Sequence, residues 1–150
     1  MELRIEGAAE LMSKLKRLGK GKVAEQAVHK GMLQGAKTVQ GAAKQLCIPG
    51  KKGGGRLRDS IEIEDVSQDT VAVGTNVEYA VYVEYGTGQL GDPTVPHTTK
   101  EYWRYQDEDG NWYTTHGQPP RPYLTPALSM SQTDVKRKVI AQLQKAIKEA

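Results

Sequence analysis

A stripe of small side chains, repeated every four residues, restricts how residues 23–46 can pack. Its members are Ala27, Gly31, Gly35, Val39 and Ala43. Because residues four apart lie on the same face of an α-helix, the spacing predicts one long helix over about Val23–Leu46. A glycine inside a helix costs about 1 kcal/mol relative to alanine. Two glycines on one face therefore indicate that another backbone packs very close, either the sheet of the same subunit or a helix of a neighbouring subunit.

Length and composition are those of one intracellular domain. A chain of 150 residues predicts a single domain over 1–150, which can bury roughly two thirds of its unfolded surface. The only cysteine, Cys47, cannot form an intramolecular bridge, and we expect it to be a small buried apolar residue. Neither a run of about twenty apolar residues nor a basic N-terminal start is present, so we expect no membrane span and no signal peptide.

The charge of the chain is nearly balanced, with 21 Lys and Arg against 18 Asp and Glu and a net charge of +3. This excess is too small to indicate nucleic-acid binding by itself. The basic residues gather in two clusters, Lys14, Lys16, Arg17, Lys20 and Lys22, and Lys51, Lys52, Arg56 and Arg58. Each cluster is either solvated surface with a flexible loop at PGKKGGG (49–55), or a non-specific contact with phosphate.

Local patterns predict an α+β fold in which an antiparallel β-sheet packs against the long helix. Alternation at Leu3 and Ile5 predicts a short strand, followed by a leucine-rich helix that ends at residues 19–21. Residues 61–66 and 71–73 predict a hairpin with its turn at 67–70. Four prolines between residues 119 and 126 precede a C-terminal amphipathic helix that should start near Ala127–Thr133. Its predicted apolar face comprises Val135, Val139, Leu143, either Ala146 or Ile147, and Ala150.

Aromatic residues gather in two segments that we take as candidate subunit-interface surfaces. Tyrosines at every third position predict a short helix over about residues 78–85, after a strand that ends at Gly74 and before a glycine stop. A turn at Asp109-Gly110 predicts a projecting β-hairpin arm over about residues 100–116. The interface candidates are Tyr79, Tyr82, Tyr85, Trp103, Tyr105 and Trp112. The alternatives are a tyrosine-rich core patch and tryptophans that cover the edge of the sheet.

No pattern in the sequence points to catalysis, a metal or a cofactor. The motifs GxSxG and H-E-x-x-H are absent, and the three histidines and Cys47 lack the short spacing of metal ligands. His116 with Asp107 or Asp109 would make a base and its orienting acid, but the predicted hairpin puts both acids at an exposed tip. We therefore expect a non-enzymatic protein without a metal site or a bound cofactor.

Three motifs in a fixed order carry a resemblance to a known family. They are GRLRDSI (55–61), VGTNVEYAVYVEYGTG (73–88) and PPRPYLTPAL (119–128), with an insert containing DGNW before the third. The chain resembles the small tail-component proteins of long-tailed bacteriophages and prophages, the gene-product-ten-like head–tail joining or neck proteins. The matching positions, which look structural rather than catalytic, are Gly55, Leu57, Ser60, Ile61, Tyr79, Ala80, Glu84, Gly86, Thr87, Gly88, Pro122, Tyr123, Leu124, Pro126 and Ala127. Tyr123 departs from the phenylalanine common in the family.

The resemblance implies an α+β domain that acts as a virion part. Such a part is assembled in the host cytoplasm into a ring, a hexamer or alternatively a dodecamer, at the head–tail junction. Its neighbours would be head-closure or connector proteins and tail-terminator or tail-tube proteins. We expect the arm and the 78–88 helix to be the two contacting surfaces of the ring, and the Lys51–Arg58 loop to reach the DNA channel. Open alternatives are a nucleic-acid-binding accessory protein, a minor tail component elsewhere in the tail, and an enzyme whose site residues lie far apart in sequence.

Overall fold

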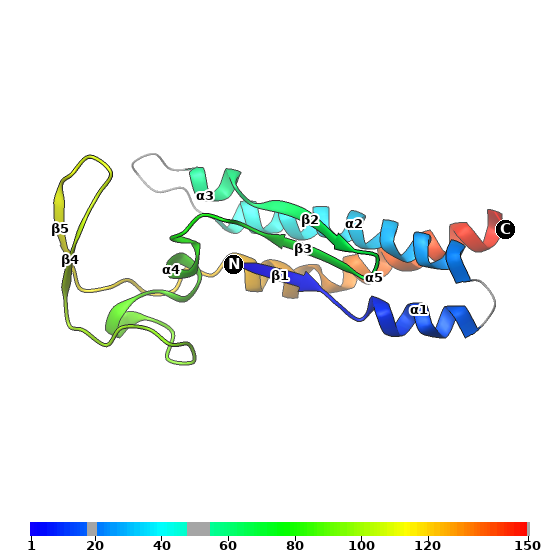
Figure 1. Ribbon diagram of the computed structural model, residues 1–150, viewed down its shortest axis with the longest axis horizontal. Helices are drawn as coiled ribbons and strands as arrows, with labels where there is room; N and C mark the ends of the chain where they lie inside the picture. The colour runs from blue at the N-terminus through cyan, green and yellow to red at the C-terminus, as the bar shows by residue number, and fades with distance from the viewer. Residues whose placement is uncertain (18–20, 48–54, 150) are drawn as a thin grey trace. The chain divides into compact units, whose positions relative to one another are not determined.

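The computed structural model describes residues 1–17, 21–47 and 55–149 of the chain (Figure 1). Its contacts divide the chain into two compact units. The first unit combines Met1–Asn76 with Tyr123–Ala150, and the second, Val77–Pro122, is inserted between these two segments. Leu18, within the predicted N-terminal helix, and residues 49–54 of the PGKKGGG segment, with Lys51 and Lys52, lie outside the described residues.

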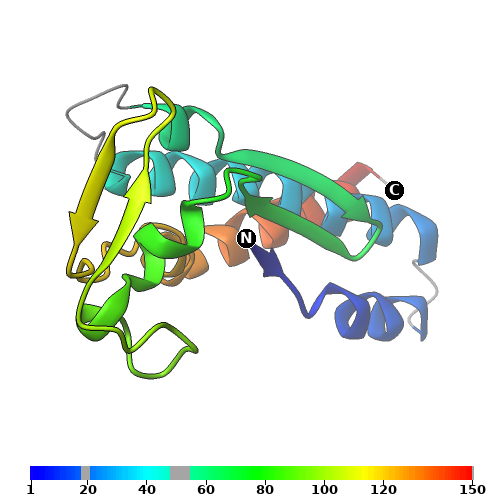
Figure 2. The ribbon, with the colours of Figure 1, turned by 60° about the vertical axis from the view of Figure 1, so that its left-hand side comes forward.

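The first unit contains a three-stranded antiparallel sheet, in the order β1-β3-β2, that lies along a pair of long helices. Its elements are β1 (Glu2–Ile5), α1 (Ala8–Arg17), α2 (Gly21–Leu46), α3 (Arg56–Asp59), β2 (Glu62–Ser67), β3 (Thr70–Gly74) and α5 (Leu124–Glu149). Figures 1 and 2 show β2 and β3 running alongside α2. The predicted α+β fold, with its antiparallel sheet against a long helix, is confirmed. Among the described helices, none combines the length and the apolar character needed to cross a lipid bilayer.

Strand β3 forms the centre of the sheet and a large part of the core. Its residues Val71, Ala72 and Val73 are all buried, and Val73 lies opposite both Leu3 of β1 and Ile63 of β2. Valine suits such a strand because its β-branched side chain packs well on a pleated surface. The hairpin predicted from residues 61–73 is therefore confirmed.

The stripe of small side chains on α2 packs against helix α5 of the same chain. We had expected it to pack against either the sheet of the same subunit or a helix of a neighbouring subunit, so this partner differs from both predictions. A Cβ atom added to Gly31 would lie 2.5 Å from the Cα atom of Val139. At Gly35 the added atom would lie 2.9 Å from Cγ1 of Val135. Only a residue without a side chain permits backbones to approach this closely, so the two glycines set the distance between α2 and α5.

Helix α5 begins at Leu124, earlier than the predicted start near Ala127–Thr133. Pro126 favours a later start, because proline has no backbone N–H to donate within a helix. It is nevertheless tolerated here, because it lies in the first turn, where backbone N–H groups have no acceptor within the helix. The side chains of Tyr123 and Leu124 are completely buried and fix the start of the helix. Farther along α5, the predicted apolar face holds for Val135, which is buried, but Ile147 is 60% exposed.

A polar network adds a second link between α2 and α5. The Thr38 hydroxyl of α2 donates a hydrogen bond of 2.7 Å to Oδ2 of Asp134 in α5. The Lys138 ammonium lies 3.0 Å from the same oxygen and also contacts the Thr38 hydroxyl. The hydrogen bond from Thr38 is the largest cause of a lowered pKa at Asp134, and Lys138 and Arg137 lower this pKa further.

We predict that Gly31→Ala lowers the free energy of unfolding by about 1 to 3 kcal/mol, a typical cost of overpacking. The matched control is Gly41→Ala in the same helix, where an added Cβ atom would meet nothing within 4 Å. This control should raise the free energy of unfolding by up to about 1 kcal/mol, because alanine favours the helix. Urea denaturation followed by circular dichroism measures both changes. Equal effects of the two substitutions would contradict the close approach of α2 and α5.

We also predict that Asp134→Asn is less stable than the unmodified protein at pH 7, and that the difference disappears in acid. A pKa that is lowered in the folded state stabilises the fold above the ordinary value of 3.8, and this contribution is lost as the pH falls below it. Thermal melting between pH 7 and pH 2 measures the difference. The control Glu149→Gln removes an exposed carboxylate from the same helix and should leave the melting curve unchanged. A difference that grows in acid would refute the assigned role.

Candidate functional site

The second unit contains the short helix and the hairpin arm that the sequence predicts. Its elements are α4 (Ala80–Tyr85), the 3-10 turn η1 (Gly88–Leu90), β4 (Trp103–Gln106) and β5 (Trp112–Thr115). Helix α4 ends at Tyr85 and is followed by Gly86, whose φ of 74° suits glycine. Strands β4 and β5 form a two-stranded sheet of their own, visible in Figure 2 as the yellow ribbon. Both the helix and the hairpin are confirmed.

Backbone contacts at two glycines join the base of the hairpin to the end of α4. Thr87 and Gln118 exchange two backbone hydrogen bonds, of 2.9 and 3.2 Å. A Cβ atom on Gly86 would lie 2.6 Å from the Gln118 carbonyl oxygen, and one on Gly117 would lie 2.3 Å from that of Thr87. Arg121 adds a backbone hydrogen bond of 2.8 Å to the Val83 carbonyl oxygen. Helix α4 and the hairpin are therefore held in one arrangement.

A groove of about 1070 Å³ runs between α4, the loop that follows it and one face of the hairpin. Five of the six predicted interface residues line it: Tyr79, Tyr82, Tyr85, Trp103 and Tyr105. Tyr82 is 54% exposed and Tyr105 is 48% exposed, so their rings are only partly packed. The hairpin arm and the 78–88 helix, which we expected to be two separate surfaces, thus form one aromatic groove.

Trp112 does not share this groove. It pairs with Gln106 in the hairpin, and successive residues of a strand point to opposite faces, so Trp112 lies on the face opposite Trp103 and Tyr105. The guanidinium carbon of Arg104 lies 5.4 Å from the centre of the Trp112 ring, within range of a cation–π contact. We had expected both tryptophans to anchor one surface, but only Trp103 lines the groove.

The two units carry opposite charge. Residues 77–122 contain seven acidic and three basic residues, which gives a net charge of −4. The rest of the chain contains 18 basic and 11 acidic residues, which gives +7. The backbone N–H of Asn111 lowers the pKa of Asp107, and a hydrogen bond from the Thr94 hydroxyl lowers that of Asp92. Both carboxylates are therefore ionised at neutral pH, so the groove belongs to an acidic unit.

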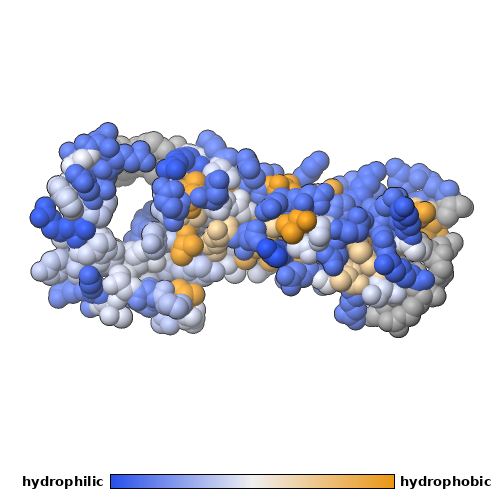
Figure 3. All heavy atoms as spheres, in the orientation of Figure 1, coloured by the Kyte–Doolittle hydropathy of each residue, from blue (hydrophilic) through white to orange (hydrophobic). Residues whose placement is uncertain are grey.

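Polar and amphipathic groups dominate the surface of the hairpin. In Figure 3 the hairpin is drawn in blue and pale shades, which are those of hydrophilic and intermediate residues. Tyrosine and tryptophan combine a large apolar ring with a polar group, and they are favoured where a side chain is partly packed and partly wet. The character of the surface thus comes from aromatic rings rather than from aliphatic side chains.

The basic candidates are only partly described. Arg56 and Arg58 lie on the single turn of α3, which the buried side chain of Leu57 anchors. Arg56 is exposed, and the Arg58 Nε atom lies 3.2 Å from Oδ1 of Asp59. Lys51 and Lys52 lie outside the described residues, so the gathering of the four basic residues stays a prediction.

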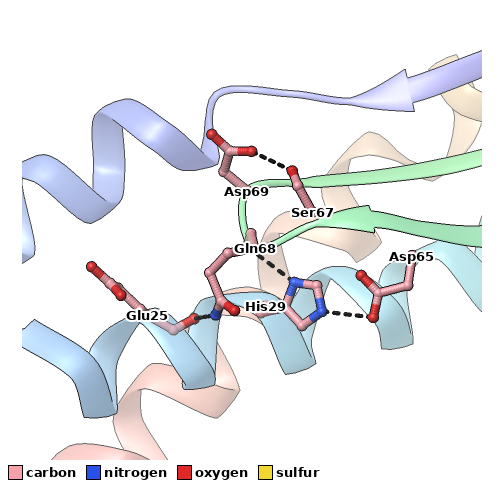
Figure 4. Close-up of polar contacts among 6 residues, drawn as sticks. All are labelled: Glu25, His29, Asp65, Ser67, Gln68 and Asp69. Atoms are coloured by element: carbon pink, nitrogen blue, oxygen red, sulfur yellow. Dashed lines mark hydrogen bonds and ion pairs between the residues drawn. The ribbon is translucent and has the colours of Figure 1, made fainter.

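Sequence reasoning missed a polar cluster that joins α2 to the β2–β3 turn (Figure 4). The His29 ring places Nε2 3.0 Å from Oδ2 of Asp65 and Nδ1 3.0 Å from the Gln68 carbonyl oxygen. The Gln68 side chain donates to the Glu25 carbonyl oxygen at 3.3 Å. No sequence signal links residues 36 positions apart in this way. Because both His29 nitrogens face protein acceptors, the cluster acts as a clamp between α2 and the turn.

The described residues contain no group of three or more His, Cys, Asp or Glu side chains placed to hold a metal ion.

A comparison with known protein families gave a match. Residues 9–86 match the model of a family described as "Bacteriophage HK97-gp10, putative tail-component". The match includes α2, the β2–β3 hairpin and three of the four groove tyrosines, Tyr79, Tyr82 and Tyr85. Searches of curated proteins and of solved structures returned no match.

We predict that Gly117→Ala disrupts the groove, because the added Cβ atom collides with the Thr87 carbonyl oxygen. Trp103 reports this change, because its ring lies close to Gly88, which in turn lies close to Gly117 at the base of the hairpin. In a Trp112→Phe background, where Trp103 is the only tryptophan, Gly117→Ala should shift the fluorescence emission to longer wavelength.

The matched control for this substitution is Gly110→Ala at the hairpin tip. Gly110 has a similar positive φ of 82°, but an added Cβ atom would meet only the Gln106 side chain, at 3.5 Å. The control should leave the emission of Trp103 unchanged. Equal shifts from both substitutions would show that backbone strain, rather than the junction with Thr87, controls the groove.

Proposed function

The chain belongs to the bacteriophage HK97-gp10 tail-component family, and we propose that it is a structural virion protein that forms a ring at the head–tail junction. In this role it joins the tail to the head around the DNA channel and performs no catalysis. Its neighbours are head-closure or connector proteins on one side and tail-terminator or tail-tube proteins on the other. The ring is a hexamer, or alternatively a dodecamer.

The aromatic groove is the observation that supports assembly. Tyrosine and tryptophan are enriched at the centres of protein interfaces, where they provide most of the binding energy. Tyr82 and Tyr105 are about half exposed on the isolated chain. Contact with another protein would remove these rings from water, at a gain of about 25 cal/mol for each Å² of apolar surface.

A closed ring requires a heterologous contact, in which one surface of a subunit meets a different surface of the next. A specific contact of this kind buries at least about 1,000 Å² in total. The aromatic groove supplies one of the two surfaces. The residues proposed to carry it are Tyr79, Tyr82, Tyr85, Trp103 and Tyr105, whereas Trp112 faces away from them.

The basic residues Lys51, Lys52, Arg56 and Arg58 are the proposed contacts with DNA in the channel. Arginine and lysine bind phosphate without reading the bases, which suits DNA that passes through a ring. Helix α3 supports this proposal because its buried Leu57 anchors a turn from which Arg56 is exposed.

The charge of the first unit favours one other candidate function, that of a nucleic-acid-binding accessory protein. A net charge of +7 over that unit provides the attraction that non-specific DNA binding needs. Such a protein would bind duplex DNA as a monomer, with an affinity that falls steeply as salt is added. A stable oligomer without DNA distinguishes the ring from this candidate.

We predict that the purified protein sediments as a single oligomer with about six times the mass of one chain. Tyr82→Ala combined with Tyr105→Ala should weaken the association at least tenfold, which corresponds to about 1.4 kcal/mol. Trp112→Ala is the matched control, since it removes a large exposed ring from the opposite face of the same hairpin. Sedimentation velocity over a range of concentrations measures the effect.

Two results would contradict this assignment. Loss of assembly in Trp112→Ala, but not in the tyrosine variant, would move the interface to the other face of the hairpin. A monomer at every concentration that binds duplex DNA with steep salt dependence would favour the accessory protein. Melting temperatures of the variants should match that of the unmodified protein, because the altered side chains are about half exposed.

A further inference from the structure

The outer face of α5 carries an exposed apolar stripe with a basic border. Ile140 is 54% exposed and Ile147 is 60% exposed. Seven residues make about two helical turns, so both side chains project from the same face, about 10 Å apart along the axis. The exposed basic residues Lys136, Arg137 and Lys148 lie beside them. We call the face formed by these five residues the α5 stripe.

The groove has the complementary character, an aromatic lining with acidic neighbours. Glu78 precedes Tyr79 directly, and Glu101 and Asp107 each lie two residues from a lining aromatic residue. The backbone N–H of Asp92 donates a hydrogen bond of 2.7 Å to the Tyr85 carbonyl oxygen, which places this ionised acid next to the lining. An amphipathic helix that docks in a groove uses apolar anchors at such spacings, and its basic border would face these carboxylates.

We propose that the aromatic groove of one subunit receives the α5 stripe of a second copy of this chain. This inference rests on the proposed ring and names the second of its two contacting surfaces. Ile140 and Ile147 insert between the tyrosine rings, and Lys136, Arg137 and Lys148 lie against the acidic rim. Each subunit offers one groove and one stripe, so the contact repeats from subunit to subunit.

Two other molecules could occupy the groove, namely the groove of a second subunit and duplex DNA. The charge of the second unit argues against both. A groove-to-groove contact would bring two units of net charge −4 together, and like charges in contact oppose association. Duplex DNA is repelled from the same acidic unit for the same reason. The α5 stripe belongs to the basic unit and meets the groove with opposite charge.

A second apolar surface continues from the stripe. Ile140 borders a cleft of about 500 Å³ in the first unit, together with Ile5, Leu128 and Val139. A neighbouring subunit seated on the stripe would also cover part of this cleft. The contact area is therefore larger than two isoleucine side chains provide.

Mixing two variants that cannot self-associate tests directly whether the groove binds the α5 stripe. The groove variant carries Tyr82→Ala and Tyr105→Ala, and the stripe variant carries Ile140→Asp and Ile147→Asp. Each should be monomeric by itself. In a 1:1 mixture, the intact stripe of the groove variant binds the intact groove of the stripe variant. The product should have twice the chain mass and grow no further, because its two remaining surfaces are both inactivated.

The matched control for the stripe carries Ala141→Asp and Lys145→Asp, two exposed residues on the adjoining face of α5. It introduces more negative charge than the stripe variant does, yet it should assemble like the unmodified protein. Sedimentation velocity and circular dichroism are measured for every variant. If the aspartates lower the melting temperature, Ile140→Ser with Ile147→Ser removes the same anchors without charge.

The outcomes separate this inference from the proposed ring. An unmodified protein that assembles, combined with a mixture that stays monomeric or grows beyond two chains, overturns the pairing and leaves the ring intact. Loss of assembly in the Ala141 and Lys145 control shows a general charge effect and also overturns the pairing. An unmodified protein that is monomeric at every concentration overturns the ring, and the pairing with it.

Discussion

The close approach of α2 and α5 at Gly31 and Gly35 is the constraint on which the first unit depends. The two segments are far apart in the sequence, so this contact joins the C-terminal helix to the N-terminal part of the fold. Any side chain at Gly31 would collide with the α5 backbone. Once the helices are paired, α2 supports β2 and β3, and the opposite face of α5 remains exposed with Ile140 and Ile147. Core packing and the proposed contact surface thus use opposite faces of one helix.

Glycine has a different role in the second unit, where it joins a helix to a hairpin. Gly86 and Gly117 have positive φ angles and permit backbone contacts that a side chain would block. These contacts place the tyrosines of α4 opposite Trp103 and Tyr105. The unit also concentrates acidic residues, so the aromatic groove is presented within a negative field. A groove that is both aromatic and acidic selects a partner that is both apolar and basic.

Local patterns predicted most elements, because turns, strands and helices leave signals within a few residues. The hairpin follows from Asp109-Gly110, and α4 follows from its tyrosines and Gly86. The partner of the α2 stripe was not predictable, since periodicity identifies a helix face but not what packs on it. The opposite orientations of Trp103 and Trp112 depend on the pairing of Gln106 with Trp112, and this register is known only once the strands are placed. The His29 cluster joins residues whose contact arises only from the fold.

Electron microscopy of the assembled protein tests the central claim, that different surfaces of identical subunits meet in a closed ring. The account predicts rings of a single size with cyclic symmetry, in which every subunit has the same two neighbours. Class averages would show six or twelve subunits around a central channel. Particles with two-fold symmetry, in which the same surface of two subunits meets itself, would contradict the claim.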